Sequence, residues 1–305
     1  MYLHKDKQLF EDVINATSDK YSIETAIVEK DYYVTMILKL LAEKSGLVVF
    51  KGGTSLSKCF QAINRFSEDI DITFSEHIGE ARRKKLKYNV MKIIGDELEL
   101  PIENWNKIES DRDLNQYLYQ YIPITGTPEE TMLPTVKVEI ALGSYSFPVE
   151  EKSVSSYVYR YLLESDEKEL IKEYELSPFK MHVQSLERTY IDKVFALCDY
   201  YIQGKSKRYS RHMYDLYKLQ TFIHFEKDFA ELVNEVREHR ADMGEKLCPS
   251  AQKAVRVSKI LKSLCEEDFF KEDYETITEY FVQDMVTYDE AKENILGIAE
   301  NSMFE

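Results

Sequence analysis

The chain has 305 residues, of which 44% are hydrophobic and 31% are charged, and its formal net charge is −15. This balance is typical of a soluble globular protein with one large domain or two smaller ones, and it excludes a disordered chain. A protein this acidic repels nucleic acid unless a local basic cluster overrides the overall charge.

The start of the chain and its apolar stretches indicate a protein without a membrane segment. Residues 1–12 are polar and contain no apolar run of the signal-peptide kind. The most apolar stretch, residues 34–42, is interrupted by Lys39 and is too short to cross a bilayer. The cysteines are widely spaced without a CxxC pair, which favours free thiols in a reducing compartment. We therefore expect a cytoplasmic protein with no membrane partner.

Two helices are predicted at the N-terminus. Residues 6–18 predict a short helix, and Ser22 is expected to cap a second helix that runs to about Lys44. The charged run Glu29-Lys30-Asp31 lies within the second helix, and its plainest interpretation is a solvated helix face.

The stretch from Val48 to Phe74 combines a short strand, two glycines, a helix and a second strand. Gly52 and Gly53 allow the backbone to approach a bulky anion, and a helix that begins near Thr54 offers free N–H groups at its positive end. Leu56, Phe60 and Ile63 have helical spacing, so this helix is expected to extend through them and to pack on a sheet. The glycine turn is therefore a candidate phosphate site.

Asp69 and Asp71 are the strongest chemical signal in the chain. In a strand they project to one side, with the isoleucines on the other. Two carboxylates on a strand suit Mg²⁺, which prefers carboxylates together with substrate phosphates. The alternative is a pair of surface aspartates on an edge strand. The glycine turn shortly before them favours the metal interpretation.

A β-rich section follows a predicted helix at 79–98. Residues 116–122 and 135–142 alternate in the manner of strands, and weaker strands are predicted at 153–159 and 177–183. The alternation of 135–142 places Val136, Val138, Ile140 and Leu142 toward the core and Lys137, Glu139 and Ala141 on the opposite face. Glu139 is therefore a candidate third carboxylate or general base, although a solvated glutamate fits the spacing equally well.

Helical periodicity dominates from residue 185 to the end, so we expect a nucleotide-binding domain at 1–184 and a helical domain at 185–305. Two charged residues of the helical half have apolar neighbours. Lys193 lies between two apolar helix rows, which is costly unless it faces a cleft or an anion such as a triphosphate. Asp215 stands among apolar residues too, and its simplest alternative role is an ion pair with Arg211.

Basic residues are concentrated at 82–92 and 205–211. Either cluster offers contacts to a nucleic-acid backbone, although a solvated helix face explains such runs more often.

Together these residues resemble the AbiEii/AbiGii-type nucleotidyltransferase family, the toxin halves of bacterial type IV toxin–antitoxin and abortive-infection systems. The resemblance covers roughly residues 25–220. It rests on Glu29-Lys30-Asp31-Tyr32, Lys51-Gly52-Gly53-Thr54-Ser55-Leu56, Arg65-Phe66-Ser67-Glu68-Asp69-Ile70-Asp71, Lys193 in IDKVFAL, and Arg211-His212-Met213-Tyr214-Asp215-Leu216.

The resemblance implies an α+β fold, in which a DNA-polymerase-β-like core with a mixed sheet and flanking helices is followed by a helical domain that completes the active-site cleft. Asp69 and Asp71 would bind Mg²⁺, and Lys193 and Asp215 would complete the catalytic set, with Arg211 and His212 in support. The implied nucleotide-binding residues are Lys51, Gly52, Gly53, Thr54, Ser55, Arg65 and Ser67.

The implied reaction is nucleotidyl transfer from an NTP, with the 3′ end of tRNA as the acceptor in some relatives and a cognate antitoxin as the partner. A transferase that modifies a protein or a small molecule is an alternative, and the net charge of −15 counts in its favour. A non-catalytic nucleotide-binding module is disfavoured, since Asp69, Asp71, Lys193 and Asp215 are all present.

Overall fold

A computed structural model describes residues 1–65, 67, 69–109, 112–124, 133–279, 282 and 284–304. Phe66 and Glu68, two members of the family-like motifs, lie outside these residues. The chain forms two compact units. The first contains Met1–Phe60 and Ser67–Val183, and the second contains Gln61–Phe66 and Gln184–Glu305. The short segment Gln61–Phe66, which the sequence groups with the first domain, therefore packs with the second unit.

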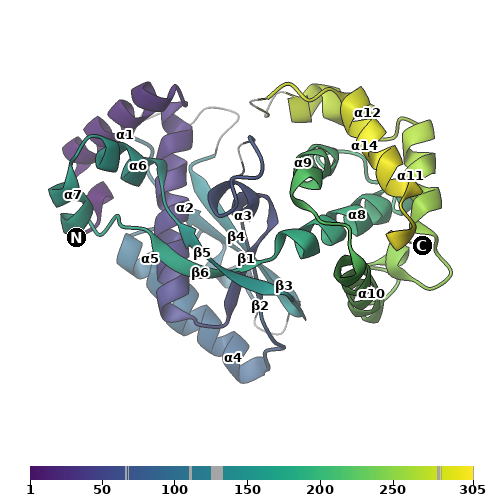
Figure 1. Ribbon diagram of the computed structural model, residues 1–305. Helices are drawn as coiled ribbons and strands as arrows, with labels where there is room; N and C mark the ends of the chain where they lie inside the picture. Colours follow the sequence, from purple (N-terminus) through teal and green to yellow (C-terminus); the bar gives the residue numbers. More distant parts are fainter. Residues whose placement is uncertain are drawn as a thin grey trace. The chain divides into compact units, whose positions relative to one another are not determined.

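The first unit is built on a six-stranded mixed sheet (Figure 1) with the order β3-β4-β2-β1-β6-β5. Its strands are β1 (Val48–Lys51), β2 (Ile70–Phe74), β3 (Leu114–Gln120), β4 (Thr135–Tyr145), β5 (Val149–Val154) and β6 (Phe179–Gln184). β1 pairs antiparallel with β2 and parallel with β6, while β4 pairs parallel with β2 and antiparallel with β3. The four predicted inward residues of β4 are buried, at 3% exposure or less. The predicted α+β class with a mixed sheet is confirmed.

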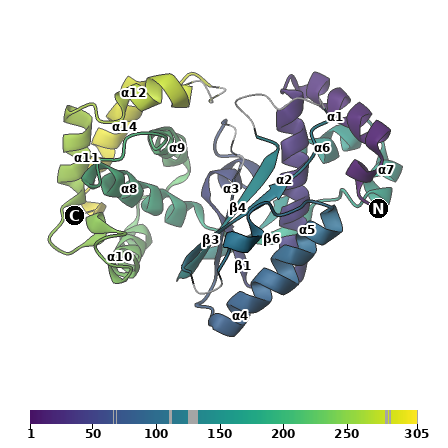
Figure 2. The ribbon, with the colours of Figure 1, turned by 180° about the vertical axis from the view of Figure 1, so that it is seen from behind.

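Helices flank this sheet. They are α1 (Lys7–Tyr21), α2 (Thr25–Lys44), α3 (Gly52–Lys58), α4 (Glu80–Lys85), α5 (Lys92–Leu98), α6 (Tyr157–Glu164) and α7 (Lys168–Glu173). A π-helical turn, Leu86–Met91, joins α4 to α5, so that the helix predicted at 79–98 is present as one continuous run (Figures 1 and 2). Most residues of α2 are buried, which makes α2 the central helix of the unit.

Three local predictions are wrong at helix and strand ends. Ser22 ends α1 in a left-handed conformation (φ 53°), and Glu24 precedes α2 instead. α3 ends at Lys58, because the residues beyond Phe60 pack with the second unit rather than continuing the helix. Around 153–159, β5 ends at Val154 and α6 begins at Tyr157, since the Ser156 side chain accepts a hydrogen bond from the Tyr159 N–H and starts a helix there.

The charged run of α2 is buried rather than solvated. Glu29, Lys30 and Asp31 are 1%, 2% and 8% exposed. The Glu29 carboxylate accepts the Ile124 N–H (3.1 Å), and the Lys30 ammonium donates to the Leu133 carbonyl (3.0 Å). Burial of charge is tolerated here because each group has a partner, a condition that helical spacing alone does not reveal.

The second unit is helical. It contains α8 (Leu186–Ile202), α9 (Arg211–Leu219), α10 (Lys227–Asp242), α11 (Val257–Glu266), α12 (Lys271–Asp273), a π-helical turn (Tyr274–Thr278) and α14 (Tyr288–Glu300). α8 packs against α9, α10 and α11 (Figure 2). Within the described ranges, no helix has the length and apolar character needed to cross a membrane.

Candidate active site

Strand pairing in the first unit brings the predicted carboxylates together. The register of β1 with β2 sets Lys51 opposite Asp71, and the register of β2 with β4 sets Asp71 opposite Glu139. Asp69 stands just before β2, two residues from Asp71 and therefore on the same side of the chain. Glu139, selected from strand alternation alone, thus lies beside the aspartate pair.

Lys137 is a member of this cluster that sequence reasoning missed. Its ammonium lies 2.8 Å from Asp69 Oδ2 and 3.0 Å from Glu139 Oε1. Gln116 of β3 adds a hydrogen bond from its side-chain amide to Glu139 Oε1 (2.8 Å). The signal was present, because the alternation of β4 places Lys137 and Glu139 on one face.

The carboxylate donors fit a divalent cation. Asp69 and Glu139 already converge on one cationic group, the Lys137 ammonium, which shows that their oxygens can be directed at a shared positive charge. Within the described part of the chain, no three His, Cys, Asp or Glu residues form a group that could hold a metal ion. The pair formed by Asp69 and Glu139 matches the one or two carboxylates by which Mg²⁺ is commonly held, with substrate phosphates and water as its other ligands.

Desolvation raises the pKa of Asp71 to about 6. The Lys51 ammonium opposes this rise, whereas the Glu139 and Asp69 carboxylates add to it. A raised carboxylate pKa among like charges indicates a position where extra positive charge is favoured.

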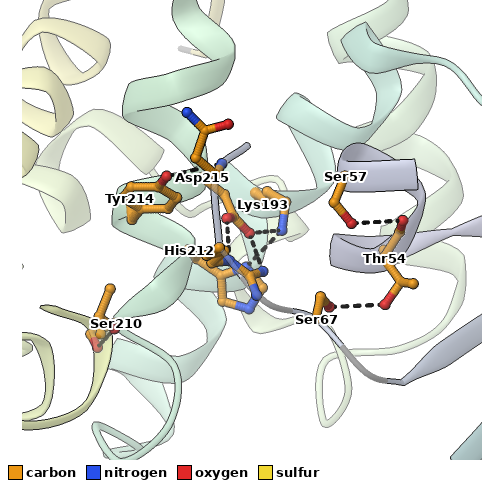
Figure 3. Close-up of polar contacts among 12 residues, drawn as sticks. Thr54, Ser57, Ser67, Lys193, Ser210, His212, Tyr214 and Asp215 are labelled. Carbon is orange, nitrogen blue, oxygen red and sulfur yellow. Dashed lines mark hydrogen bonds and ion pairs between the residues drawn. The ribbon is translucent and has the colours of Figure 1, made fainter. Parts of the chain in front are cut away.

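The glycine turn lies directly against Asp71. Gly52 has φ +79°, and a Cβ built on it would lie 2.0 Å from Asp71 Oδ2. Only glycine combines this left-handed backbone with so close a contact. The next turn of α3 is fastened to the same strand, since the Thr54 hydroxyl donates to the Asp69 carbonyl (2.5 Å) and lies 2.9 Å from Ser67 Oγ (Figure 3). Ser55 Oγ donates to the Gly52 carbonyl (2.8 Å).

A second charged cluster lies inside the second unit and is centred on Asp215 of α9. The Arg65 guanidinium donates to both oxygens of Asp215, through Nε at 2.7 Å and Nη2 at 2.8 Å. The Lys193 ammonium of α8 donates to Asp215 Oδ2 at 2.6 Å (Figure 3). Asp215 is fully buried, and Arg65 and Lys193 are 7% and 6% exposed. The partners of Asp215 are therefore Arg65 and Lys193, and not Arg211, which the sequence offered as the alternative.

Charge pairing sets the protonation states of this cluster. Burial alone would raise the pKa of Asp215, but Arg65 and Lys193 hold it well below the usual aspartate range. Burial lowers the pKa of Lys193, an effect that Asp215 opposes. Burial and the Lys193 ammonium hold the pKa of His212 well below its ordinary value, so its Nδ1, 3.4 Å from Lys193 Nζ, accepts from the ammonium as a neutral imidazole. Asp215 is consequently a poor proton acceptor and a strong anchor for two cations.

The remaining sequence candidates are placed as follows. Arg65 was expected beside the phosphate turn but belongs to the second unit. There the Asn64 N–H donates to the Tyr214 hydroxyl (3.1 Å), and the Arg65 backbone forms an antiparallel β-bridge with Val282. Arg211 is exposed at the start of α9. In the basic clusters, Lys205, Lys207 and Arg208 are exposed, and Arg82 and Lys84 pair with Glu76 and Glu80.

Comparison with known proteins places the chain in a family. The model of the AbiEii nucleotidyl transferase toxin family, type IV toxin–antitoxin system, matches residues 39–294. A solved structure, the MenT4 nucleotidyltransferase toxin of Mycobacterium tuberculosis, is similar with a TM-score of 0.58 and 17% sequence identity, over 90% of this chain and 83% of that one. At this identity the likeness shows a shared fold. No curated protein matches the sequence. Because the family match spans most of the chain, the protein belongs to the AbiEii family of type IV toxin–antitoxin nucleotidyltransferase toxins and is a nucleotidyltransferase.

Proposed function

We propose that this nucleotidyltransferase moves a nucleoside monophosphate from an NTP to an acceptor hydroxyl with the help of Mg²⁺. The observation that carries the proposal is the position of Asp71 opposite Glu139 and against the Gly52 turn, with Asp69 and Glu139 both paired with the Lys137 ammonium. Asp69 and Asp71 would hold the metal, and Glu139 would supply the third carboxylate. When bound, the metal would neutralise charge on the NTP phosphates.

The NTP phosphates are assigned to the start of α3. Lys51, Gly53 and Ser55 offer an ammonium, a backbone N–H and a hydroxyl in one short segment. Thr54 and Ser67 are proposed to hold the turn in place, because Thr54 is bonded to the strand that carries the aspartates.

The Asp215 cluster is proposed to serve the same reaction from the helical domain, residues 185–305. Arg65 stands four residues before Asp69 in the chain. Lys193 would offset negative charge that develops on the phosphates. Asp215 would orient Lys193 and Arg65, with His212 as a neutral neighbour of Lys193 and Arg211 as a further positive charge.

The reaction is expected to be an in-line displacement. The acceptor oxygen forms a bond to the α-phosphorus, the bond from that phosphorus to the bridging oxygen breaks, and pyrophosphate leaves. The acceptor proton passes to a carboxylate of the first unit, Glu139 or one of the aspartates, which as general base would contribute roughly 10²–10⁴-fold. Asp215 is unsuited to this step because Arg65 and Lys193 occupy both of its oxygens.

We propose the 3′ end of a tRNA as the acceptor, the cytoplasm as the site of action and a cognate antitoxin as the regulating partner. Support for the acceptor comes from exposed Lys205, Lys207 and Arg208, which form a basic strip on an otherwise acidic protein. Among the described residues the four cysteines are free thiols, in keeping with a reducing compartment.

The experiment is a label-transfer assay. Purified protein is incubated with Mg²⁺, each α-labelled NTP in turn and total tRNA, beside Asp69→Ala and a reaction with EDTA. We expect label on tRNA from at least one NTP with the wild type only. Label that moves equally with Asp69→Ala would refute the assignment of the site.

The net charge of −15 favours a second candidate acceptor, a protein or a small molecule. The same assay with tRNA-free cell extract separates the two. Label that appears on protein or on a small molecule, and stays absent from tRNA, would replace the tRNA proposal while it preserves the transferase chemistry.

A further inference from the structure

A buried ion pair joins the last residue of α3 to α2. Lys58 Nζ lies 2.5 Å from Asp31 Oδ1, and the two side chains are 8% and 9% exposed. Lys58 also donates to Thr35 Oγ1 (2.8 Å) and to the Ser155 carbonyl (3.3 Å). The second oxygen of Asp31 accepts the Tyr157 N–H (2.9 Å). Two separate segments, α2 and the connection between β5 and α6, are thus tied to the end of α3.

The Lys58 ammonium is committed to these contacts. An ammonium has three protons, and Asp31, Thr35 and Ser155 provide three acceptors. Lys58 therefore has no proton left for a phosphate, even though it stands in the helix of the glycine turn. Its contacts fix the position of α3 instead.

The position of α3 matters because this helix touches both aspartates. Its first residue, Gly52, lies against the Asp71 side chain, and Thr54 is bonded to the Asp69 carbonyl. With seven residues, α3 is too short to be stable by itself. The placement of α3 must therefore come from tertiary contacts. Among the contacts described above, the pair of Lys58 with Asp31 of buried α2 is the one that joins two charged groups.

The stability of the fold alone does not explain why a buried ion pair stands at this position. Apolar residues of similar size are often as stabilising as a buried ion pair, because desolvation offsets the attraction between the charges. What the pair provides beyond apolar packing is a direction, since its hydrogen bonds hold Lys58 at one place on α2.

We propose that Asp31 and Lys58 are positioning residues for nucleotidyl transfer. They hold α3 where Gly52 and Thr54 set the Asp71 and Asp69 carboxylates for the metal–nucleotide complex. The proposal rests on the function proposed above for these carboxylates, and it assigns a task to the buried aspartate of the Glu29-Lys30-Asp31 run.

The test measures unfolding free energy and NTP affinity in parallel. The variants are Lys58→Met, the double variant Asp31→Asn/Lys58→Met, and a matched control, Lys39→Met. Lys39 is also a lysine of the first unit with little exposure (14%), and it is bonded to the Glu175 carbonyl (2.7 Å) rather than to α3. Affinity is measured by calorimetry with Mg²⁺ and each of the four NTPs, well below the melting temperature.

We expect Lys58→Met to lose stability, because it leaves the Asp31 carboxylate buried without its cation. The double variant should regain much of that stability and still bind NTP about tenfold more weakly than wild type, since α3 is no longer held in register. Lys39→Met should bind NTP as wild type does.

A folded double variant that binds NTP within about twofold of wild type would overturn the positioning role. If both Lys58 variants fail to fold, the deciding variant is Thr35→Val, which removes one of the three hydrogen bonds of Lys58. An NTP affinity lowered about threefold supports the proposal, and an unchanged NTP affinity overturns it. Absence of NTP binding by the wild type would refute the proposed function itself. Equal binding by all variants would refute the positioning role alone.

Discussion

Replacement of Gly52 by alanine is the sharpest test of the phosphate turn. The new Cβ would lie 2.0 Å from Asp71 Oδ2, 2.8 Å from its Cγ and 3.0 Å from its Cβ. Real Cβ contacts essentially never fall below 3.0 Å, so the Asp71 carboxylate must move by about 1 Å or more. Because the Cγ and Cβ of Asp71 are also close, rotation of the carboxylate alone does not relieve the contact.

Two costs follow from Gly52→Ala. A non-glycine residue in the left-handed region costs about 1–2 kcal/mol, which lowers the melting temperature of a unit of this size by roughly 2–8 °C. Displacement of a metal-binding carboxylate by about 1 Å lowers kcat/KM by about 10². Both are measured with the label-transfer assay and a thermal melt.

Two glycine controls separate strain from displacement. Gly204 also has a positive φ (+67°), with no atom within 4 Å of a built Cβ, so Gly204→Ala carries the strain alone. Gly79 has neither the positive φ nor a neighbour within 4 Å. We expect Gly204→Ala to melt earlier yet stay active, and Gly79→Ala to resemble wild type. A folded Gly52→Ala protein with at least half of the wild-type activity would refute the reasoning.

Three further predictions concern charge. Burial raises the pKa of Glu29 to about 7 from an ordinary value of 4.5. The folded state therefore loses about 3 kcal/mol of stability as the pH rises from 4.5 to 7. Glu29→Gln should abolish this pH dependence, which urea melts at about pH 5 and 8 measure. Asp215→Asn should cost about 3–5 kcal/mol of stability, because it leaves two buried cations without a counter-charge. As a control, Lys218→Met, which breaks a partly exposed ion pair with Asp284, should cost at most about 1 kcal/mol. Since the pKa of Asp215 is lowered, its contribution is complete above the ordinary aspartate pKa of about 3.9 and fades only at more acid pH. Neutralising Lys205, Lys207 and Arg208 together should flatten the salt dependence of RNA binding by up to about 2 in log–log slope, and an unchanged slope would make this cluster a solvated face.

Sequence patterns predicted the structure well where a helix or strand buries one of its faces. The alternation of residues 135–142 identified the four inward residues of β4 and placed Glu139 on the face that the structure sets beside Asp71. The register that makes them neighbours depends on which strands pair, and a single sequence does not encode that pairing locally.

Buried charge was the harder problem. Lys193 was noticed because apolar rows flank it, and Asp215 because of its apolar neighbours, and both prove to be buried. Their shared partner, Arg65, lies about 130 residues or more before them in the chain, so spacing gave no hint of it. Glu29, Lys30 and Asp31 were interpreted as solvated for the same reason: their partners come from distant segments.

The two clusters have opposite charge, and this contrast makes Asp215 informative. In the first unit, Asp69, Asp71 and Glu139 outnumber Lys51 and Lys137, which leaves an excess of negative charge suited to a cation. In the second unit, Arg65 and Lys193 outnumber Asp215, which leaves an excess of positive charge suited to a phosphate. Asp215→Asn increases that positive charge. If the cluster acted through charge alone, the variant would bind NTP more tightly than wild type. If Asp215 acts by holding Lys193 and Arg65 in place, the folded variant binds NTP more weakly and transfers more slowly, which is the outcome we expect because both cations lose the carboxylate that orients them.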